Sequence, residues 1–278
     1  MSGSSIRFSF DILHYMLTLY TTSLIISILY TSLLFLLALK KKDNSIIDIA
    51  YGPGFIVTAS VLSVLTLSVT PLSPFSVILL LCIYIWGTRL SYRIYKKNRN
   101  KPEDFRYAAW REAWSKKGQL YVLVRSYLQI FVLQGVVISI VLLPFTLSLW
   151  GGSSAVTLLI LGLALWVTGF MFEAIGDAQL DRFIQNKDPN KGTIMKSGLW
   201  KYTRHPNYFG ESLMWWGLAL VAFGGVATYF VFLSPLLITY LLTKVSGIPM
   251  LEKKWEGVPE WEAYKKQTSA FFPLPPKK

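Results

Sequence analysis

The segment 197–217 carries the side chains best suited to bind a polar ligand. It reads SGLWKYTRHPNYFGESLMWWG, beginning polar and basic and ending as an apolar helix. Its polar edge holds Lys201, Arg204, His205, Asn207, Tyr208 and Glu211. Helical spacing places Arg204 and Tyr208 on one face, and Asn207 and Glu211 on the same or an adjacent face. Because burying such groups unpaired costs several kcal/mol each, their convergence indicates a polar-ligand site.

A simpler explanation covers part of this segment. Cations and aromatic residues commonly flank a membrane helix at the lipid–water interface, which accounts for Lys201, Arg204 and Trp216. It does not account for Asn207 and Glu211 inside the apolar edge. We therefore favour the ligand site.

A second set of polar groups precedes this segment, within a long apolar run. Glu173, Asp177 and Asp181 are each four residues apart, which stacks them on one helix face. Like charges at this spacing repel, so they need cationic or amide partners. Glu173 and Asp177 can accept hydrogen bonds from the ribose hydroxyls or the amide of a nucleotide. Pairing between helices with Arg182, Lys187 or Arg204 explains them equally well.

Basic residues around the same segment suit a phosphate group. Lys196, Lys201 and Arg204 are natural phosphate partners, arginine through its bidentate fork. Lipid headgroups attract the same cations. His205 precedes Pro206 at the start of a helix, where it can cap the helix or contact a phosphate. A single histidine at such a position is more often structural than catalytic.

The composition defines the elements that must hold these groups. Of 278 residues, 53% are hydrophobic and only 15% charged, and the apolar residues lie in long runs. This is typical of an all-α, polytopic integral membrane protein. The net charge of +13 falls in short loops, so we expect no nucleic-acid partner. With one cysteine, Cys82, and two histidines, we expect no metal site, and no obligate protein partner is evident.

The apolar runs predict seven transmembrane helices. They cover about residues 17–39, 46–69, 75–95, 121–145, 156–183, 208–223 and 228–243. The loops after the first, third, fifth and seventh runs are rich in Lys and Arg, whereas those after the second, fourth and sixth contain none. The positive-inside rule then predicts the N-terminus outside and the C-terminus inside.

This topology brings the polar groups to one side of the membrane. The cytoplasmic ends of the last three spans and the tail hold Glu173, Asp177, Asn207, Glu211 and Glu252. The cytoplasmic halves of the second and third spans hold Asp48, Tyr51 and Arg89. We therefore expect one cavity open to the cytoplasm, polar at its mouth and apolar deeper in.

Aromatic residues of the second and third spans suit the apolar part of that cavity. Tyr51, Tyr84 and Trp86 can line it, although aromatic core packing explains them too, and Trp86 best. Tyr51 directly precedes a Gly-Pro-Gly break, and such breaks in membrane helices usually have a packing or ligand reason. Asp48 lies near the interface, where it can pair with Lys42 or Arg89.

The text GLWKYTRHPNYFGESLMWWG resembles the carboxy-terminal signature of the steroid 5-alpha-reductase family, specifically its bacterial branch. The similarity extends upstream through FMFEAIGDAQLDRF and downstream through SGIPMLEKKWEGVPEWEAYKKQTSAFFP. It covers the first half of the chain only in outline. The resemblance implies a seven-helix membrane enzyme that binds NADPH in a cytoplasmic polar cavity. Such an enzyme reduces a carbon–carbon double bond conjugated to a ketone.

The resemblance also assigns cofactor-binding residues by position. The family's asparagine and acid in N-x-x-G-E fall on Asn207 and Glu211. Its aspartate in the fifth span falls on Asp177, where Glu173 replaces an asparagine four residues earlier, and its tyrosine before the motif falls on Tyr202. With the neighbouring basic and aromatic groups, the expected cofactor-binding set is Glu173, Asp177, Lys196, Lys201, Tyr202, Arg204, His205, Asn207, Tyr208, Glu211 and Glu252.

One departure from the family concerns the substrate. The steroid enzymes hold the substrate carbonyl with a Gln-Glu pair in the second span, where this chain has Ala50-Tyr51. The tyrosine expected in the third span falls near Trp86, with Tyr84 two residues away. NADPH binding is therefore better supported than a steroid substrate, and Tyr51 and Trp86 are the expected substrate contacts.

The implied reaction needs a hydride, a hydrogen-bond donor and a proton. A hydride would pass from NADPH to the β-carbon of an enone, and a donor near the carbonyl would stabilise the developing enolate. A proton would then complete the α-carbon. Tyr51, Tyr84 or Arg89 can be the donor, with Asp48 orienting it.

The whole chain, residues 1–278, is predicted to form a single membrane domain. Residues 1–145 would supply four substrate-side helices, and residues 146–278 three cofactor-binding helices and a cytoplasmic tail. We expect a multi-pass protein of the bacterial inner membrane with its active site open to the cytoplasm. A lipophilic small molecule and membrane lipids are its expected partners.

Two other functions remain open. The same carboxy-terminal motif also marks isoprenylcysteine-type methyltransferases, which use S-adenosylmethionine. A non-enzymatic lipid-binding or transporter-like protein is the third possibility. Against it, the chain shows no inverted repeat, and its polar groups cluster on one side rather than near the midplane.

Overall fold

The computed structural model describes residues 3–150, 154–186, 192–224 and 226–277, with side chains from residue 14 onward apart from 226–228. These residues are helical or irregular, with one isolated β-bridge between Thr203 and Ser269 and no strand. Parts of two predicted loops, residues 151–153 and 187–191, lie outside the described residues. The predicted all-α fold class is confirmed for the part that is described.

The chain forms two compact units. The first consists of Met1–Ser153 with Ala222–Val231, and the second of Ser154–Val221 with Phe232–Lys278. Each unit is described below by itself.

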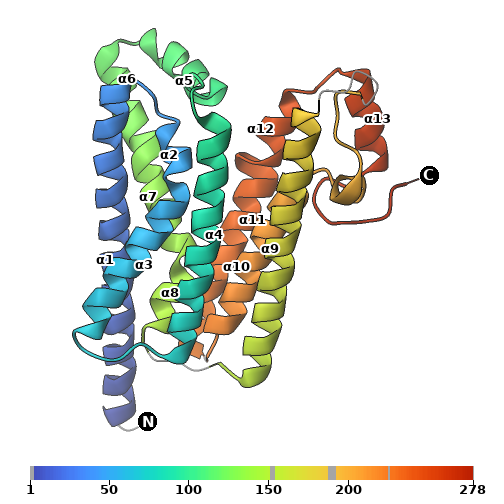
Figure 1. Ribbon diagram of the computed structural model, residues 1–278. Helices are drawn as coiled ribbons and strands as arrows, with labels where there is room; N and C mark the ends of the chain where they lie inside the picture. Colours follow the sequence, from blue (N-terminus) through green and yellow to red (C-terminus); the bar gives the residue numbers. More distant parts are fainter. Residues whose placement is uncertain (1–2, 151–153, 187–191, 225, 278) are drawn as a thin grey trace. The chain divides into compact units, whose positions relative to one another are not determined.

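The first unit is a bundle of helices (Figure 1). Its elements are α1 (Gly3–Lys41), α2 (Ile46–Ile49), α3 (Tyr51–Leu67), α4 (Pro74–Asn98), α5 (Phe105–Ser115), α6 (Gln119–Arg125), the π-helical turn η1 (Ser126–Val132), α7 (Leu133–Val141) and α8 (Leu143–Ser148). Helix α1 packs against α3 and α7, and α3 packs against α4. The predicted span 121–145 is therefore a run of shorter helical pieces rather than one regular helix.

The predicted second span is broken near its start. Ala50 (φ −85°, ψ 0°) separates α2 from α3, so the break precedes the Gly-Pro-Gly sequence. Gly52 lies directly against α4, because a Cβ there would come within 2.3 Å of the Gly87 carbonyl oxygen. The backbones of helices α3 and α4 thus approach each other closely at this point, where the Ser91 side chain also lies.

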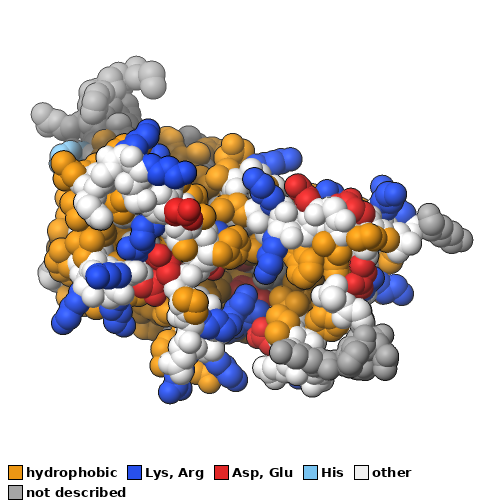
Figure 2. Space-filling view, turned by 90° about the horizontal axis from the view of Figure 1, so that it is seen from above, with side chains coloured by type: hydrophobic (Ala, Val, Ile, Leu, Met, Phe, Trp, Pro, Cys, Tyr) orange, Lys and Arg blue, Asp and Glu red, His pale blue; other side chains and the backbone are white. Residues whose placement is uncertain are grey.

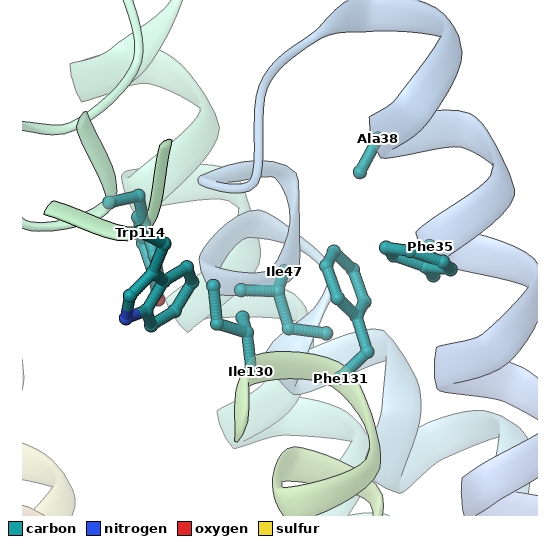
Figure 3. Close-up of a cluster of buried hydrophobic side chains, with 7 residues drawn as sticks. Phe35, Ala38, Ile47, Trp114, Ile130 and Phe131 are labelled. Atoms are coloured by element: carbon teal, nitrogen blue, oxygen red, sulfur yellow. The ribbon is translucent and has the colours of Figure 1, made fainter. Parts of the chain in front are cut away.

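Seven buried residues form a hydrophobic cluster that joins α1, α2, α5 and η1. They are Phe35, Ala38, Ile47, Tyr107, Trp114, Ile130 and Phe131. Figure 3 shows Ile47 of α2 among Trp114, Ile130 and Phe131. The aromatic face of α5 is therefore part of the core of the first unit, which holds the loop between α4 and α6 in place.

The second unit contains the carboxy-terminal helices. Its elements are α9 (Val156–Gln185), the 3-10 turn η3 (Gly198–Lys201), α10 (Pro206–Ala222), α11 (Leu233–Tyr240), the π-helical turn η5 (Leu241–Val245), α12 (Ile248–Lys253) and α13 (Pro259–Gln267). The 3-10 segment η4 (Val226–Phe232) lies where the chain returns from the first unit to the second.

Helices α9 and α10 pack with their backbones in contact. Gly162, Gly169 and Gly176 recur every seven residues on α9, which returns them to one face after two turns. A Cβ on Gly162 would lie 2.6 Å from the Gly217 carbonyl oxygen, and one on Gly169 would lie 2.5 Å from the Gly210 carbonyl oxygen. Small residues permit such close crossings in membrane proteins. We call these five glycines the glycine seam.

Five helical segments among the described residues are long and apolar enough to cross a membrane. They are His14–Lys41, Pro74–Asn98, Gln119–Val141, Val156–Gln185 and Tyr229–Lys253, and Tyr51–Leu67 is a shorter apolar helix. Large apolar side chains on the helices are exposed, among them Leu33 and Val64, at 68% each. An apolar surface of this kind needs lipid or a partner to cover it.

Candidate functional site

The glycine seam determines where Glu173 lies in the second unit. A Cβ on Gly210 would come within 2.6 Å of the Glu173 nitrogen and 3.1 Å of its Cβ. Glu173 of α9 therefore borders α10 next to Glu211. The close approach of the two backbones places these two residues at the same level along the helices.

The next turn of α9 meets the start of α10. A Cβ on Gly176 would lie 3.0 Å from Cγ of Pro206 and 3.5 Å from the Asn207 nitrogen. Asp177 directly follows Gly176, so it lies at the level of Asn207. The structure therefore brings together four of the predicted cofactor-binding residues. Glu173 lies level with Glu211, and Asp177 lies level with Asn207 one turn away.

Of these four residues, the three carboxylates are buried and Asn207 is half-buried. The exposed fractions are 2% for Glu173, 3% for Asp177 and 8% for Glu211. The Oδ1 atom of Asn207 is buried and accepts no hydrogen bond within the described part of the chain. A buried acceptor without a donor costs about 1–3 kcal/mol. Asn207 is therefore suited to a ligand that donates a hydrogen bond.

Arg204 is also buried, but it directs its donors into the protein. Its Nε and Nη2 atoms donate to the two carboxylate oxygens of Glu252, at 2.8 and 3.1 Å. Its Nη1 atom donates to the carbonyl oxygens of Lys265, at 3.2 Å, and Thr268. The guanidinium carbon lies 5.7 Å from the ring centroid of Trp261. The residue predicted to bind phosphate thus already holds a bidentate carboxylate.

His205 shares the same carboxylate. Its Nε2 atom lies 3.0 Å from Oε1 of Glu252. Burial lowers the pKa of His205, and the nearby Glu252 offsets this only in part, so the neutral ring is favoured. The ring stacks on Tyr208 with centroids 5.5 Å apart and planes 7° apart. His205 therefore links Glu252 to the orientation of Tyr208.

The two predicted lysines lie before α10 and reach the surface. Lys196 pairs with Glu260 at 2.8 Å, and the hydrogen bonds from Lys196 and from Thr193 lower the pKa of Glu260 to about 2. Lys201 and Tyr202 are exposed, with Lys201 Nζ 6.0 Å from the ring centroid of Tyr202. An exposed ion pair contributes little, so Lys196 can exchange Glu260 for a phosphate.

Several residues that position this loop were not predicted. Trp200 donates from Nε1 to the Gly176 carbonyl oxygen at 2.9 Å, and the Leu199 nitrogen donates to Gln179 at 2.9 Å. The hydroxyl of Tyr264 donates to the Trp200 carbonyl oxygen. The signal available in the sequence was a cluster of aromatic residues in an otherwise polar tail.

The predicted substrate residues of the first unit fall into separate groups. Tyr51, Phe55 and Trp86 form an edge-to-face trio, with ring centroids 5.0, 5.2 and 6.4 Å apart. Trp86 is only 2% exposed. Tyr84 lies elsewhere on α4, where its hydroxyl is hydrogen-bonded to Ser60. The structure thus brings Tyr51 and Trp86 together, and Tyr84 is not part of their cluster.

Asp48 is held by α5, which sequence reasoning missed. Its Oδ2 atom accepts a hydrogen bond from Arg106 Nη2 at 2.6 Å, and its Oδ1 atom accepts one from the Tyr107 hydroxyl at 2.6 Å. Burial raises the pKa of Asp48 and that of Tyr107. The sequence predicts Lys42 or Arg89 as its partner, whereas the structure pairs Asp48 with Arg106 and Tyr107. Arg89 itself is half-buried on α4.

The exposed apolar helices and the buried polar cluster together define an α-helical membrane protein with a candidate ligand site in its second unit. The described residues contain no group of three or more His, Cys, Asp or Glu side chains that could hold a metal ion. Over residues 34–268 the sequence matches the family described as "Protein of unknown function (DUF1295)", and the chain belongs to this family. The family is a steroid 5-alpha-reductase-like group. No curated protein and no solved structure matches the chain.

Proposed function

We propose that the protein is an NADPH-dependent reductase of a carbon–carbon double bond conjugated to a carbonyl group in a lipophilic, steroid-like substrate. The observation that carries this proposal is the polar cluster of α9 and α10, in which Glu173, Asp177 and Glu211 are buried and Asn207 has a buried Oδ1 atom. A buried acceptor without a donor, as at Asn207 Oδ1, is costly, which favours a ligand that donates a hydrogen bond to it. Membership of a steroid 5-alpha-reductase-like family supports the same assignment.

The residues of the second unit fit this cofactor. Buried carboxylates accept hydrogen bonds from ribose hydroxyls and from an amide, and Asn207 Oδ1 is a buried acceptor suited to a donor. Lys196 and Lys201 supply cations for the phosphate groups, and Tyr202 and Tyr208 supply ring faces and hydroxyls. When bound, NADPH supplies the hydride.

The residues of the first unit fit a lipophilic substrate. Tyr51 and Trp86 present aromatic surface, which contributes a large apolar contact area. Tyr51, Tyr84 and Arg89 are the proposed donors to the substrate carbonyl. Asp48 is the proposed orienting residue, since its hydrogen bonds to α5 fix the helical turn that precedes Tyr51.

The proposed topology has seven spans, with the N-terminus outside and the C-terminus in the cytoplasm of a bacterial cell. The five long helical segments account for five spans, and α3 and α10, of 17 residues each, account for the other two. Seventeen residues are about the minimum that crosses the hydrocarbon core. Lys and Arg side chains gather at the α5 end of the first unit (Figure 2), which supports placing that end in the cytoplasm.

Ligand-induced stabilisation of the purified protein tests the function. Saturating NADPH should raise the melting temperature by roughly 5–10 °C, because a ligand at about 100 times its Kd contributes about 2.7 kcal/mol. A shift with S-adenosylmethionine in its place would make the protein a methyltransferase. No shift with either would favour lipid binding or transport.

Variants of the buried cluster locate the binding site. Asn207→Ala and Glu211→Gln should abolish the NADPH-induced shift. Asp177→Asn should do so too, whereas Asp181→Asn, one turn further along α9 and less buried, is the matched control. An undiminished shift in all three cluster variants would remove these residues from the site.

A further inference from the structure

The C-terminal segment 268–277, here called the strap, is hydrogen-bonded to the chain just before α10. Thr203 and Ser269 form a parallel β-bridge, in which the Arg204 nitrogen donates to the Ser269 carbonyl oxygen at 2.8 Å. Further along, the Leu274 nitrogen donates to the Tyr202 carbonyl oxygen at 3.0 Å. The strap therefore follows the motif that leads into the candidate site.

Two buried side chains hold the strap. The hydroxyl of Thr203, whose side chain is fully buried, lies 3.2 Å from the Ala270 carbonyl oxygen and 2.9 Å from that of Phe271. Arg204 donates to the Thr268 carbonyl oxygen, while Glu252 fixes the guanidinium through two hydrogen bonds. The hydrogen bonds of the Arg204 side chain thus end on Glu252, on Lys265 of α13 and at the beginning of the strap.

The strap reaches the buried cluster through aromatic contacts. Phe271 and Phe272 pack edge-on against Phe209 of α10, with ring centroids 5.8 and 6.2 Å away. Phe209 in turn packs against Phe172 of α9 at 5.2 Å. Phe172 directly precedes Glu173, and Phe209 lies two residues after Asn207. A displaced strap would remove the packing that supports both residues.

We propose that Arg204, Thr203 and Glu252 are positioning residues, which hold the strap so that Phe209 keeps the first turn of α10 in register with Glu173. Arg204 then acts on the cofactor site through the strap and does not bind a phosphate group itself. This inference rests on the proposed function and changes the role expected of Arg204 within it. Bidentate pairing with the half-buried carboxylate of Glu252 leaves the guanidinium little freedom to turn to a ligand.

Variants that weaken the hydrogen bonds to the strap without changing the net charge test this role. Arg204→Lys keeps the positive charge but loses the planar guanidinium that binds Glu252 through two hydrogen bonds. Thr203→Val removes the hydroxyl at nearly constant side-chain volume. Thr203→Ser keeps the hydroxyl and serves as the rescue, and Thr168→Val, on the exposed face of α9, is the matched control. For each full-length variant, we would measure hydrogen exchange of the strap without nucleotide, and the Kd values of NADPH and NADH.

Release of the strap should weaken both nucleotides equally. We expect Arg204→Lys and Thr203→Val to speed exchange in the strap and to raise both Kd values by the same factor, roughly three- to tenfold. Thr203→Ser and Thr168→Val should behave as wild type. A larger loss for NADPH than for NADH in Arg204→Lys, with Thr203→Val unaffected, would make Arg204 a phosphate ligand and overturn the proposal.

Three further outcomes can be distinguished. Faster exchange of the strap with unchanged Kd values would show that the strap does not position the site. Rapid exchange in the wild-type protein would show that there is no held strap at all. Absence of nucleotide binding by a wild-type protein whose strap exchanges slowly would contradict the proposed function instead, since exchange is measured without nucleotide.

Discussion

Glu252 accepts hydrogen bonds from two basic side chains that precede it by 47 and 48 positions. Reasoning from residue types assigned Arg204, His205 and Glu252 to a ligand, because a guanidinium, an imidazole and a carboxylate all suit a nucleotide. In the structure, Arg204 and His205 both hydrogen-bond to Glu252 instead. Types and local spacing could identify the region, but a pairing made by folding α12 against the start of α10 is not visible in the sequence.

The neutral His205 makes stability depend on pH. Burial lowers its pKa in the folded protein, so below about pH 6.5 the unfolded chain gains a proton that the folded protein does not. This contribution to stability is therefore complete above about pH 6.5 and is lost as the pH falls from there to the lowered pKa. The melting temperature should fall over this range by less in His205→Gln. Equal slopes in both proteins would show that another group is responsible.

At the scale of elements, apolar runs located the helices but not their interruptions. The expected spans 156–183 and 208–223 correspond to Val156–Gln185 and Pro206–Ala222. The sequence pattern predicts a break at the Gly-Pro-Gly sequence, but the helix is interrupted earlier, at Ala50. This interruption coincides with a tertiary contact, a hydrogen bond from the Tyr30 hydroxyl to the Ala50 carbonyl oxygen at 2.9 Å. A hydropathy pattern carries no information about such a contact.

The glycine seam gives a prediction for α9 and α10. Gly169→Ala should place a methyl group 2.5 Å from the Gly210 carbonyl oxygen, which forces the two backbones apart. Overpacking of this kind costs about 1–3 kcal/mol, so the melting temperature should fall by roughly 2–10 °C and the NADPH-induced shift should weaken. Ala164→Val, on the exposed face of α9, should change neither quantity. A Gly169→Ala protein with normal stability and binding would contradict the close crossing.

For the whole molecule, composition alone was enough to predict an all-α membrane protein, since apolar runs of about 20 residues are typical of transmembrane helices. The match over residues 34–268 places the chain in a steroid 5-alpha-reductase-like family, in agreement with the resemblance read from the 198–217 segment. The chain forms two compact units, and the single membrane domain and the substrate and cofactor roles of residues 1–145 and 146–278 stay predictions.

The single cysteine makes the proposed topology directly testable. In a Cys82→Ser background, new cysteines at exposed positions report which side of the membrane each loop faces. A membrane-impermeant maleimide should label Thr70→Cys in intact cells, and Lys101→Cys and Lys266→Cys only after permeabilisation. Labelling of Thr70→Cys and Lys101→Cys from the same side would show that the chain between them does not cross the membrane, which contradicts the proposed topology.

Direct backbone contact between α9 and α10 also restricts how the protein can move. Helices separated by a layer of side chains can slide as that layer repacks, but here no such layer exists at Gly162, Gly169, Gly210 and Gly217. Rotating one helix against the other would open a void or drive carbonyl oxygens together. The two helices must therefore travel as one rigid body. Any closure around a bound molecule therefore falls to the residues outside this pair.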